Sequence, residues 1–167
     1  MKKMFLSLLF VMATLMTAQA QKFALIDMEF ILKQIPSYEQ ANKQMENLSK
    51  KWQSEVEAKA KEAKALYEAY QKTASAMNAQ QRTAKEEEII NKEKEAAELR
   101  QTYFGPQGEA MKKRQELISP IQDAIYNAVK EIATQKGYDA VIDRASAQSM
   151  IYASPRIDIS NEVLSKL

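Results

Sequence analysis

The sequence contains no cysteine and no histidine among its 167 residues. Without cysteine the chain has neither a disulfide framework nor a lipid-attachment thiol, so its stability must come from packing or assembly. The two missing residue types are also the commonest general base, the commonest metal ligand and the best thiol nucleophile. An enzyme built from this sequence would have to use carboxylates, lysines and hydroxyls.

A strong net charge is also missing. The chain has 24 basic and 22 acidic residues, and the two numbers become equal if Lys2 and Lys3 are removed with an N-terminal signal. A nucleic-acid binder would normally present a basic face, so no nucleic-acid partner is expected. The sequence has no glycine-rich phosphate loop either, so we expect no nucleotide cofactor.

Only one long apolar run is present, from Met4 to Met16. It follows two lysines and precedes Ala18-Gln19-Ala20, the small-x-small pattern of a signal cleavage site. The run is shorter than the roughly 20 residues that a membrane-spanning helix needs. We therefore interpret residues 1–20 as a cleavable secretory signal and expect the mature chain to start at Gln21.

Glycine and proline are absent from Ser37 to Phe104, where Ala, Glu, Lys and Gln dominate. This composition predicts helix. Apolar or small residues recur in steps of three or four that average near 3.6, a stripe that would pack on a partner helix. The stripe consists of Ala41, Met45, Leu48, Trp52, Val56, Ala60, Ala63, Tyr67, Tyr70, Ala74 and Met77.

Capping patterns indicate where the helices begin. Ser37 with Gln40 and Thr83 with Glu86 are capping boxes, so residues 78–82 are predicted to be the turn of a helical hairpin. Its first arm would extend about 60 Å at ~1.5 Å per residue. A compact globule of this size would be only about 40 Å across, so the hairpin is expected to project from a body.

The returning arm is interrupted at Gly105-Pro106-Gln107-Gly108, which predicts a kink or a short unwound turn. Ser119-Pro120 is predicted to be either a new helix start or a second kink. A turn near Gln80 would place Trp52 opposite the interruption. The alternative is that Trp52 lies between the arms at another level.

Short strand-like segments lie on both sides of the hairpin, at residues 22–27, 138–143 and 148–152. The hairpin, residues 37–116, is therefore an insertion in a β-rich association body formed by residues 21–36 and 117–167. The sequence predicts an α+β fold with this organisation.

The body is small enough that self-association is expected. It falls below the roughly 70 to 80 residues that a single core usually requires. A small sheet with open edges commonly hides those edges in an oligomer. Leu25, Val141 and Ile151 are the aliphatic strand positions that we expect association to bury.

Three segments occur in a characteristic order around the charged hairpin: Phe23-Ala24-Leu25-Ile26-Asp27, Tyr138-Asp139-Ala140-Val141-Ile142-Asp143 and Ile157-Asp158-Ile159-Ser160-Asn161-Glu162-Val163-Leu164. With them the whole mature chain resembles the Skp (OmpH) family of periplasmic chaperones. The resemblance implies a homotrimer with a β-barrel-like body and three coiled-coil arms around a cavity. It further implies ATP-independent holding of unfolded outer-membrane proteins, without catalysis or a cofactor.

The charge of the arms departs from that resemblance. Better-known members of the family have basic arms, whereas residues 39–116 here contain 15 basic and 14 acidic residues. The contact with anionic lipid or lipopolysaccharide that the family implies is therefore not favoured. Lys50-Lys51 and Lys112-Lys113-Arg114 are interpreted as solvated helix faces.

Client-binding residues are sought among the large aromatics of the arms. Tyr67, Tyr70, Tyr103 and Phe104 are the candidates, because aromatics near a glycine interruption can present apolar area that nothing local covers. Exposed aromatics of this kind can also be incidental. Contacts between the two arms are expected instead for Met45, Leu48 and Leu99.

Asp27 and Asp143 end two of the strand-like segments and could form a carboxylate pair for acid–base chemistry. Strand ends commonly carry Asp for turn hydrogen bonds, however, and no nucleophile, metal partner or glycine-rich loop accompanies the pair. We interpret both as structural and expect no catalytic residue and no metal site.

The alternative function is a structural or adaptor protein of the cell envelope, with the hairpin as a spacer or as a docking arm for another coiled coil. Sustained heptads with charged flanks would favour it. The spacing near 3.6 and the interrupted returning arm favour a flexible arm instead.

Overall fold

The computed structural model describes residues 21–147 and 149–167, so the predicted signal, residues 1–20, lies outside the described residues. The described chain divides into two compact units. We call residues 21–31 together with 127–167 the body, and Leu32–Tyr126 the hairpin unit. Among the described residues, no helix combines the length and the apolar character that a membrane span needs.

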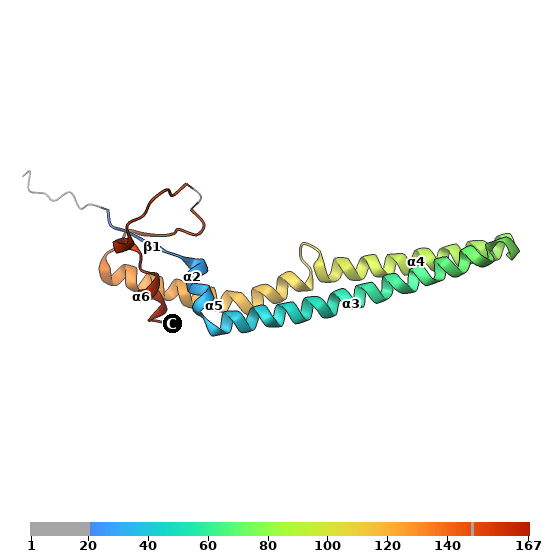
Figure 1. The fold of residues 1–167 in the computed structure, drawn as a ribbon, viewed down its shortest axis with the longest axis horizontal. Coiled ribbons are helices and arrows are strands. Elements are labelled where there is room, and N and C mark those ends of the chain that lie inside the picture. The colour runs from blue at the N-terminus through green and yellow to red at the C-terminus, as the bar shows by residue number, and fades with distance from the viewer. Residues whose placement is uncertain (1–20, 148) are drawn as a thin grey trace, which may run out of the picture. The chain divides into compact units, whose positions relative to one another are not determined.

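The elements follow the predicted order, with helices dominating (Figure 1). They are β1 (Phe23–Ile26), α2 (Met28–Gln34), α3 (Pro36–Thr73), η1 (Ala74–Ala76), α4 (Ala79–Phe104), α5 (Glu109–Lys136), β2 (Ala140–Asp143), η2 (Pro155–Ile157) and α6 (Ser160–Leu164). A long helical hairpin and a two-stranded sheet therefore make up an α+β fold, as the sequence predicted.

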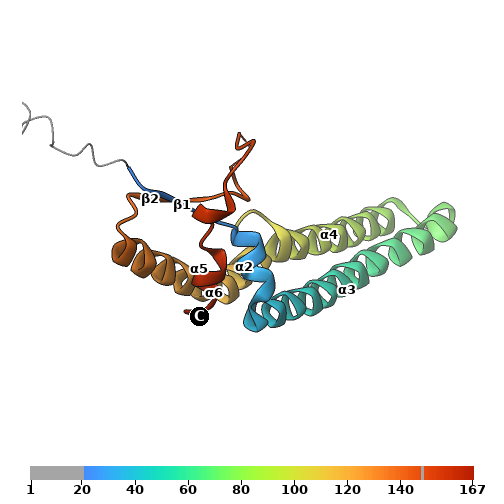
Figure 2. The same cartoon turned by 60° about the vertical axis from the view of Figure 1, so that its left-hand side comes forward.

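Helices α3 and α4 run side by side in both views (Figures 1 and 2). The seam between them buries small and aliphatic residues, namely Ala41, Met45, Val56 and Ala63 of α3 and Ile89 and Ala96 of α4. Leu48 and Leu99 are half-buried. The burial of Met45, Leu48 and Leu99 is what we expected of residues that join the arms.

The seam differs from the sequence stripe at two positions. Buried and half-buried positions of α3 include residues 41, 45, 48, 52, 56, 59, 63, 66 and 70, which keep the predicted average spacing of about 3.6. Those of α4 fall at residues 89, 92, 96, 99 and 103, with the 3.5-residue spacing of supercoiled helices. On α3, Lys59 and Leu66 are half-buried in place of the predicted Ala60 and Tyr67, and Tyr67 is 47% exposed.

The turn of the hairpin lies earlier than predicted. Asn78 forms the capping box of α4, because its Oδ1 accepts from the Gln81 backbone N–H at 2.9 Å and Gln81 Oε1 accepts from the Asn78 N–H at 3.0 Å. The predicted box at Thr83 was wrong, since the Thr83 hydroxyl instead donates to the Ala79 carbonyl within the helix. Asn is as good an N-cap as Thr and comes first in the chain.

Prolines account for two further differences. Helix α3 begins at Pro36 after Ile35, without a side-chain cap, so the predicted capping box at Ser37 was wrong. Proline suits the first helical position because that position needs no backbone donor. Pro120 lies inside α5, so no new helix starts at Ser119.

In the body, β1 and β2 pair in parallel, with Phe23 opposite Ala140 and Ile26 opposite Asp143. The predicted third strand is wrong in its described part, because residues 149–152 form no strand. The edge of β1 away from β2 is occupied instead by Asp158 and the following residue, whose N–H donates to the Leu25 carbonyl at 2.9 Å. The apolar core of the body comprises Ala24, Leu25, Ile26, Ile31, Ala128, Ile132, Ile159 and Val163.

Candidate functional site

The interruption of the returning arm is a tight loop between α4 and α5, seen in Figure 1 as a bulge. The Gly105 N–H donates to the Gln101 carbonyl and the Gly108 N–H to the Gly105 carbonyl, each at 2.9 Å. Gly108 is buried, and a Cβ on it would lie 2.7 Å from the Tyr103 carbonyl oxygen. Of the two predicted alternatives, a kink or a short unwound turn, the structure has the turn, which is closely packed and requires glycine.

An aromatic cluster adjoins this loop. The rings of Trp52 and Tyr103 stack with centroids 5.3 Å apart, and Phe104 meets Trp52 edge-on at 6.4 Å. Tyr103 and Phe104 directly precede Gly105, so the prediction that Trp52 packs near the interruption is confirmed. Stacked and edge-on aromatic pairs of this kind add stability beyond the area that they bury.

Two of the four aromatic candidates are hydrogen-bonded across the hairpin. The Tyr103 hydroxyl of α4 donates to Glu55 of α3 at 2.5 Å, and the Tyr70 hydroxyl of α3 donates to Glu86 of α4. In each pair the hydrogen bond to the carboxylate is the main cause that raises the tyrosine pKa above its ordinary value. Both tyrosines therefore hold the arms together through their hydroxyl groups.

Tyr67 and Phe104 are the more exposed of the four candidates, at 47% and 44%. They line two different grooves. The groove beside Tyr67 measures about 490 Å³, and its lining residues include Ala60, Ala63, Ala96 and Ala97. The groove beside Phe104 measures about 440 Å³ and has Met45 and Met111 in its wall.

The charged side chains of the hairpin form many ion pairs within single helices. Lys50 pairs with Glu46 at 2.5 Å and Lys113 with Glu116 at 2.8 Å. These pairs are largely exposed, so each contributes little to stability. Arg114 differs from its neighbours, because within the described residues it has no ion pair.

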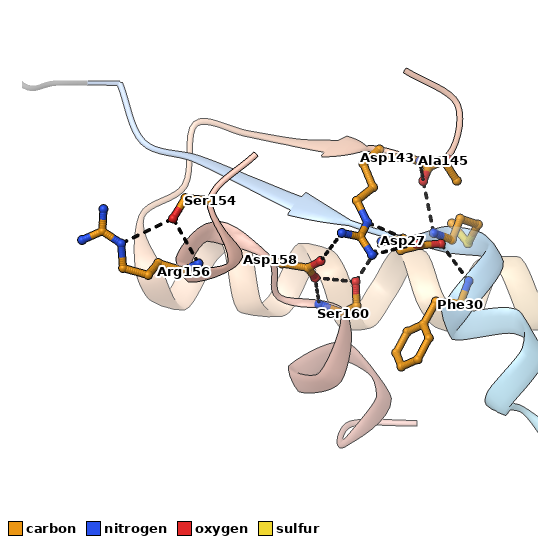
Figure 3. A network of polar contacts seen from close by, with 10 residues as sticks. Asp27, Phe30, Asp143, Ala145, Ser154, Arg156, Asp158 and Ser160 are labelled. Atoms are coloured by element: carbon orange, nitrogen blue, oxygen red, sulfur yellow. Dashed lines mark hydrogen bonds and ion pairs between the residues drawn. The ribbon is translucent and has the colours of Figure 1, made fainter. Parts of the chain in front are cut away.

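The carboxylates at the strand ends of the body form a hydrogen-bonded network (Figure 3). Asp27 accepts from Arg144 Nη2 at 2.9 Å and from the Phe30 N–H at 2.8 Å, which caps α2. Asp143 accepts from the N–H groups of Met28 and Ala145. These are the local turn and cap roles that strand-end Asp residues commonly have.

The C-terminal segment joins the same network. Arg144 Nη1 lies 3.3 Å from Asp158, and the Ser160 hydroxyl accepts from the Asp27 N–H at 2.8 Å while donating to Asp158 at 2.6 Å. Figure 3 shows Asp27, Asp158 and Ser160 directed toward one another. The network therefore fastens both strand ends to the start of α6. Among the described residues, no group of three acidic side chains is placed to hold a metal ion.

The three association candidates lie in different surroundings. Leu25 is 3% exposed within the core of the body, Val141 on β2 is half-buried, and Ile151 is fully exposed on the loop after β2. The neighbouring Tyr152 is 80% exposed. Leu25 therefore already has a core environment in the single chain, whereas Ile151 has its whole side chain available.

A family model described as outer membrane protein (OmpH-like) matches residues 22–167. The chain belongs to the OmpH-like family. Two curated relatives of this OmpH-like chain are both named chaperone protein Skp. The protein of Yersinia enterocolitica is 31% identical over 90% of this chain and 88% of its own. That of Photorhabdus luminescens is 30% identical over 100% of this chain and 99% of its own.

A crystal structure described as an outer membrane chaperone (OmpH-like) from Caulobacter crescentus CB15 resembles the OmpH-like chain with a TM-score of 0.67. The match covers 89% of this chain and 85% of the other, at 10% identity. At that identity the likeness concerns the fold alone. The family predicted from the sequence is confirmed, and membership of a family with relatives named chaperones supports a chaperone role.

Sequence reasoning missed several residues that shape the hairpin surface. Met111 and Arg114, one helical turn apart after the interruption, line the groove beside Phe104. Their spacing was a signal for a shared face, but only the course of the loop determines that this face meets Phe104. The sequence did not indicate that Glu55 and Glu86 accept hydrogen bonds from tyrosines. Such a bond between two arms depends on which residues of α3 and α4 lie opposite one another.

Proposed function

We propose that this OmpH-like chain is a periplasmic holding chaperone, which binds unfolded outer-membrane proteins in a cavity between helical arms and keeps them from aggregating. Binding needs no ATP and no cofactor, and the protein catalyses no reaction. The observation that carries the proposal is the family match over residues 22–167, with relatives named chaperone protein Skp along nearly their whole length. Residues 1–20 would direct the chain to the periplasm and be removed.

The proposal assigns different tasks to different parts of the chain. Residues 37–116 form the arm that contacts clients, and residues 21–36 with 117–167 form the association body. Tyr67 and Phe104 present the apolar area for client contact, and Tyr70 and Tyr103 contribute ring faces beside their hydroxyl hydrogen bonds. Many weak contacts of this kind suit clients that lack a fixed shape.

Assembly into a homotrimer is part of the proposal. Within the described residues, the outer edge of β2 has no strand partner, and Ile142 of that strand is 41% exposed. An unpaired edge next to exposed apolar side chains favours association. Val141 and Ile151 would be covered by neighbouring subunits, while Leu25 supports the edge from inside the core.

An aggregation assay tests the proposed function. A urea-unfolded outer-membrane barrel is diluted into buffer with and without the mature protein, in the absence of ATP, and light scattering is recorded. We expect scattering to fall in proportion to the added protein until the assembly is saturated. Undiminished scattering at excess protein would contradict the holding function.

The adaptor function is kept as a second candidate because of one observation, the 3.5-residue repeat of the buried and half-buried positions of α4. That repeat is typical of coiled coils, which commonly serve as spacers and docking arms. An adaptor would leave the scattering of the diluted barrel unchanged. The same assay therefore distinguishes the two functions.

A further inference from the structure

The groove beside Phe104 adjoins the interruption of the returning arm. We call it the break groove, and it is lined by Asn42, Met45, Glu46, Ser49, Phe104, Gly105, Ala110, Met111 and Arg114. Met45 is 7% exposed, whereas Phe104 and Met111 are 44% and 55% exposed. The groove therefore has a buried base and two large apolar side chains that remain open to solvent. Gly105 contributes no side chain that could fill it.

The charged residues around the break groove differ in whether they have a partner. Glu46 is paired with Lys50 at 2.5 Å, and Glu109 is paired with Lys112 at 3.0 Å. Arg114, also part of the lining, has no ion pair within the described residues. The rim thus carries an available guanidinium next to apolar walls, and a guanidinium can bind a carboxylate through two parallel hydrogen bonds.

We propose that the break groove binds an extended segment of an unfolded outer-membrane protein in which a large apolar side chain is followed within two residues by Asp or Glu. The inference rests on the proposed function and adds to it a site and a sequence preference. The apolar side chain lies between Phe104 and Met111, and the carboxylate pairs with Arg114. Methionine suits such a site because its flexible thioether adapts to side chains of different shape.

Trp52 supplies the readout, because it is the chain's single tryptophan and its ring lies 6.4 Å from that of Phe104. The probes are two end-blocked peptides, Ser-Gly-Phe-Ser-Asp-Gly-Ser and the same peptide with Asn in place of Asp. They are titrated into the mature protein and followed by Trp52 emission and by calorimetry. We expect the Asp peptide to bind about threefold more tightly at low salt, the size of an exposed ion pair. The difference should vanish at about 1 M salt.

Arg114→Gln is the decisive variant, and Arg100→Gln is its matched control. Arg100 is likewise an exposed arginine of the returning arm without an ion pair in the described part of the chain, but it lines the other groove. We expect Arg114→Gln to bind both peptides equally and Arg100→Gln to keep the threefold preference. Met111→Ala should weaken both peptides alike, because it removes apolar area without changing charge.

The proposal is overturned if the wild-type protein binds the two peptides equally, if neither peptide binds, or if Arg100→Gln loses the preference as Arg114→Gln does. Vesicles of anionic lipid are titrated in the same way. The proposal is also overturned if the vesicles shift Trp52 emission and the Asp peptide does not. The holding function is judged separately by scattering of the diluted barrel. Loss of the peptide preference with intact protection would refute the groove and leave the proposed function standing.

Discussion

At the scale of single residues, the hairpin is held by two tyrosine hydroxyls that cross it in opposite directions. Tyr70 on α3 donates to Glu86, and Tyr103 on α4 donates to Glu55. Each bond joins helices that also meet through small aliphatic side chains, the Trp52–Tyr103 stack and the Lys59–Glu95 ion pair. Aromatic residues in this seam therefore have a structural role in addition to any contact with clients.

These two bonds predict how the stability of the hairpin depends on alkaline pH. The pKa of each tyrosine is raised in the folded chain, so the stabilising contribution is complete below the ordinary value of 10.0 and is lost as the pH rises above it. We expect the urea midpoint of the wild type to fall more between pH 9 and pH 11 than that of the double variant Tyr70→Phe/Tyr103→Phe. Trp52 fluorescence would follow unfolding.

Tyr67→Phe is the control for this pH dependence, since within the described residues no partner is found for the Tyr67 hydroxyl. Its midpoint should change with pH as the wild type does. Equal pH slopes for the double variant and the wild type would contradict the role of the two hydroxyls.

Gly108 is predicted to tolerate no side chain. In Gly108→Ala the new Cβ would lie 2.7 Å from the Tyr103 carbonyl oxygen and 2.8 Å from that of Thr102, so the loop must shift. We expect a loss of about 1–3 kcal/mol in the free energy of unfolding, as for other overpacked sites. Trp52 emission should also change, because Trp52 stacks on Tyr103. Gln107→Ala, on an exposed neighbour in the loop, should leave both measurements unchanged.

At the scale of elements, the positions of the long helices could be predicted from the sequence. Which residues of α3 and α4 face one another could not. The lack of glycine and proline predicts the length of the arms, because helix propensity accumulates over many residues. The choice between adjacent seam residues depends on how the two arms pair, which the pattern of one arm does not reveal. The sequence stripe therefore contained Tyr67, whereas the paired helices bury Leu66 more deeply.

Caps and strands were harder to predict, because several segments of the sequence suit the same position. Ser37, Thr83 and Asn78 can all cap a helix, and the local sequence does not show which will be used. The expected strand at 148–152 has suitable residues, but the segment around Asp158 takes the place beside β1. In the candidate site, antiparallel counting was enough to place Trp52 near the interruption. The exposure of Phe104 depends on how the loop closes.

The corrected seam leads to a prediction on two adjacent residues. Leu66→Ala should lower the free energy of unfolding by about 1–2 kcal/mol, because it removes a half-buried aliphatic side chain from between the arms. Tyr67→Ala should change stability by less than about 0.5 kcal/mol, the usual range for surface positions. Urea denaturation measures both, and a larger loss for Tyr67→Ala would show that Tyr67, as the sequence stripe predicted, and not Leu66 lies in the seam.

At the scale of the whole molecule, the proposed function requires that client holding and assembly be separable. Joining residue 44 to residue 116 through a short turn removes residues 45–115, which are most of the arm. It keeps the association body, residues 21–36 with 117–167. We expect this protein to remain oligomeric by light-scattering mass and to lose protection of the diluted barrel, because no arms remain to enclose it. Protection by the armless protein would contradict holding between the arms.

The complementary prediction concerns the body with its arms intact. In Val141→Asp an unpaired charge replaces an aliphatic residue at the proposed subunit contact, which should cost a few kcal/mol and release monomers. Monomers would present one arm each, so protection should weaken sharply. Val129→Asp is the comparison variant, because Val129 is also a half-buried valine and lies on α5 rather than on a strand. Monomers that protect as well as the wild type would refute the cooperation of several arms.

The parallel pairing of β1 with β2 also sets an order of events during folding. The paired residues are separated by 117 positions, and the bond network that completes the body includes Asp158 and Ser160, close to the C-terminal end of the sequence. The hairpin, in contrast, closes around a short turn and can zip up from contacts that are local in the sequence. Its formation shortens the loop that the strands must close. We therefore expect a chain emerging N-terminus first to form its arm before its body, and the proposed association to wait for the last residues.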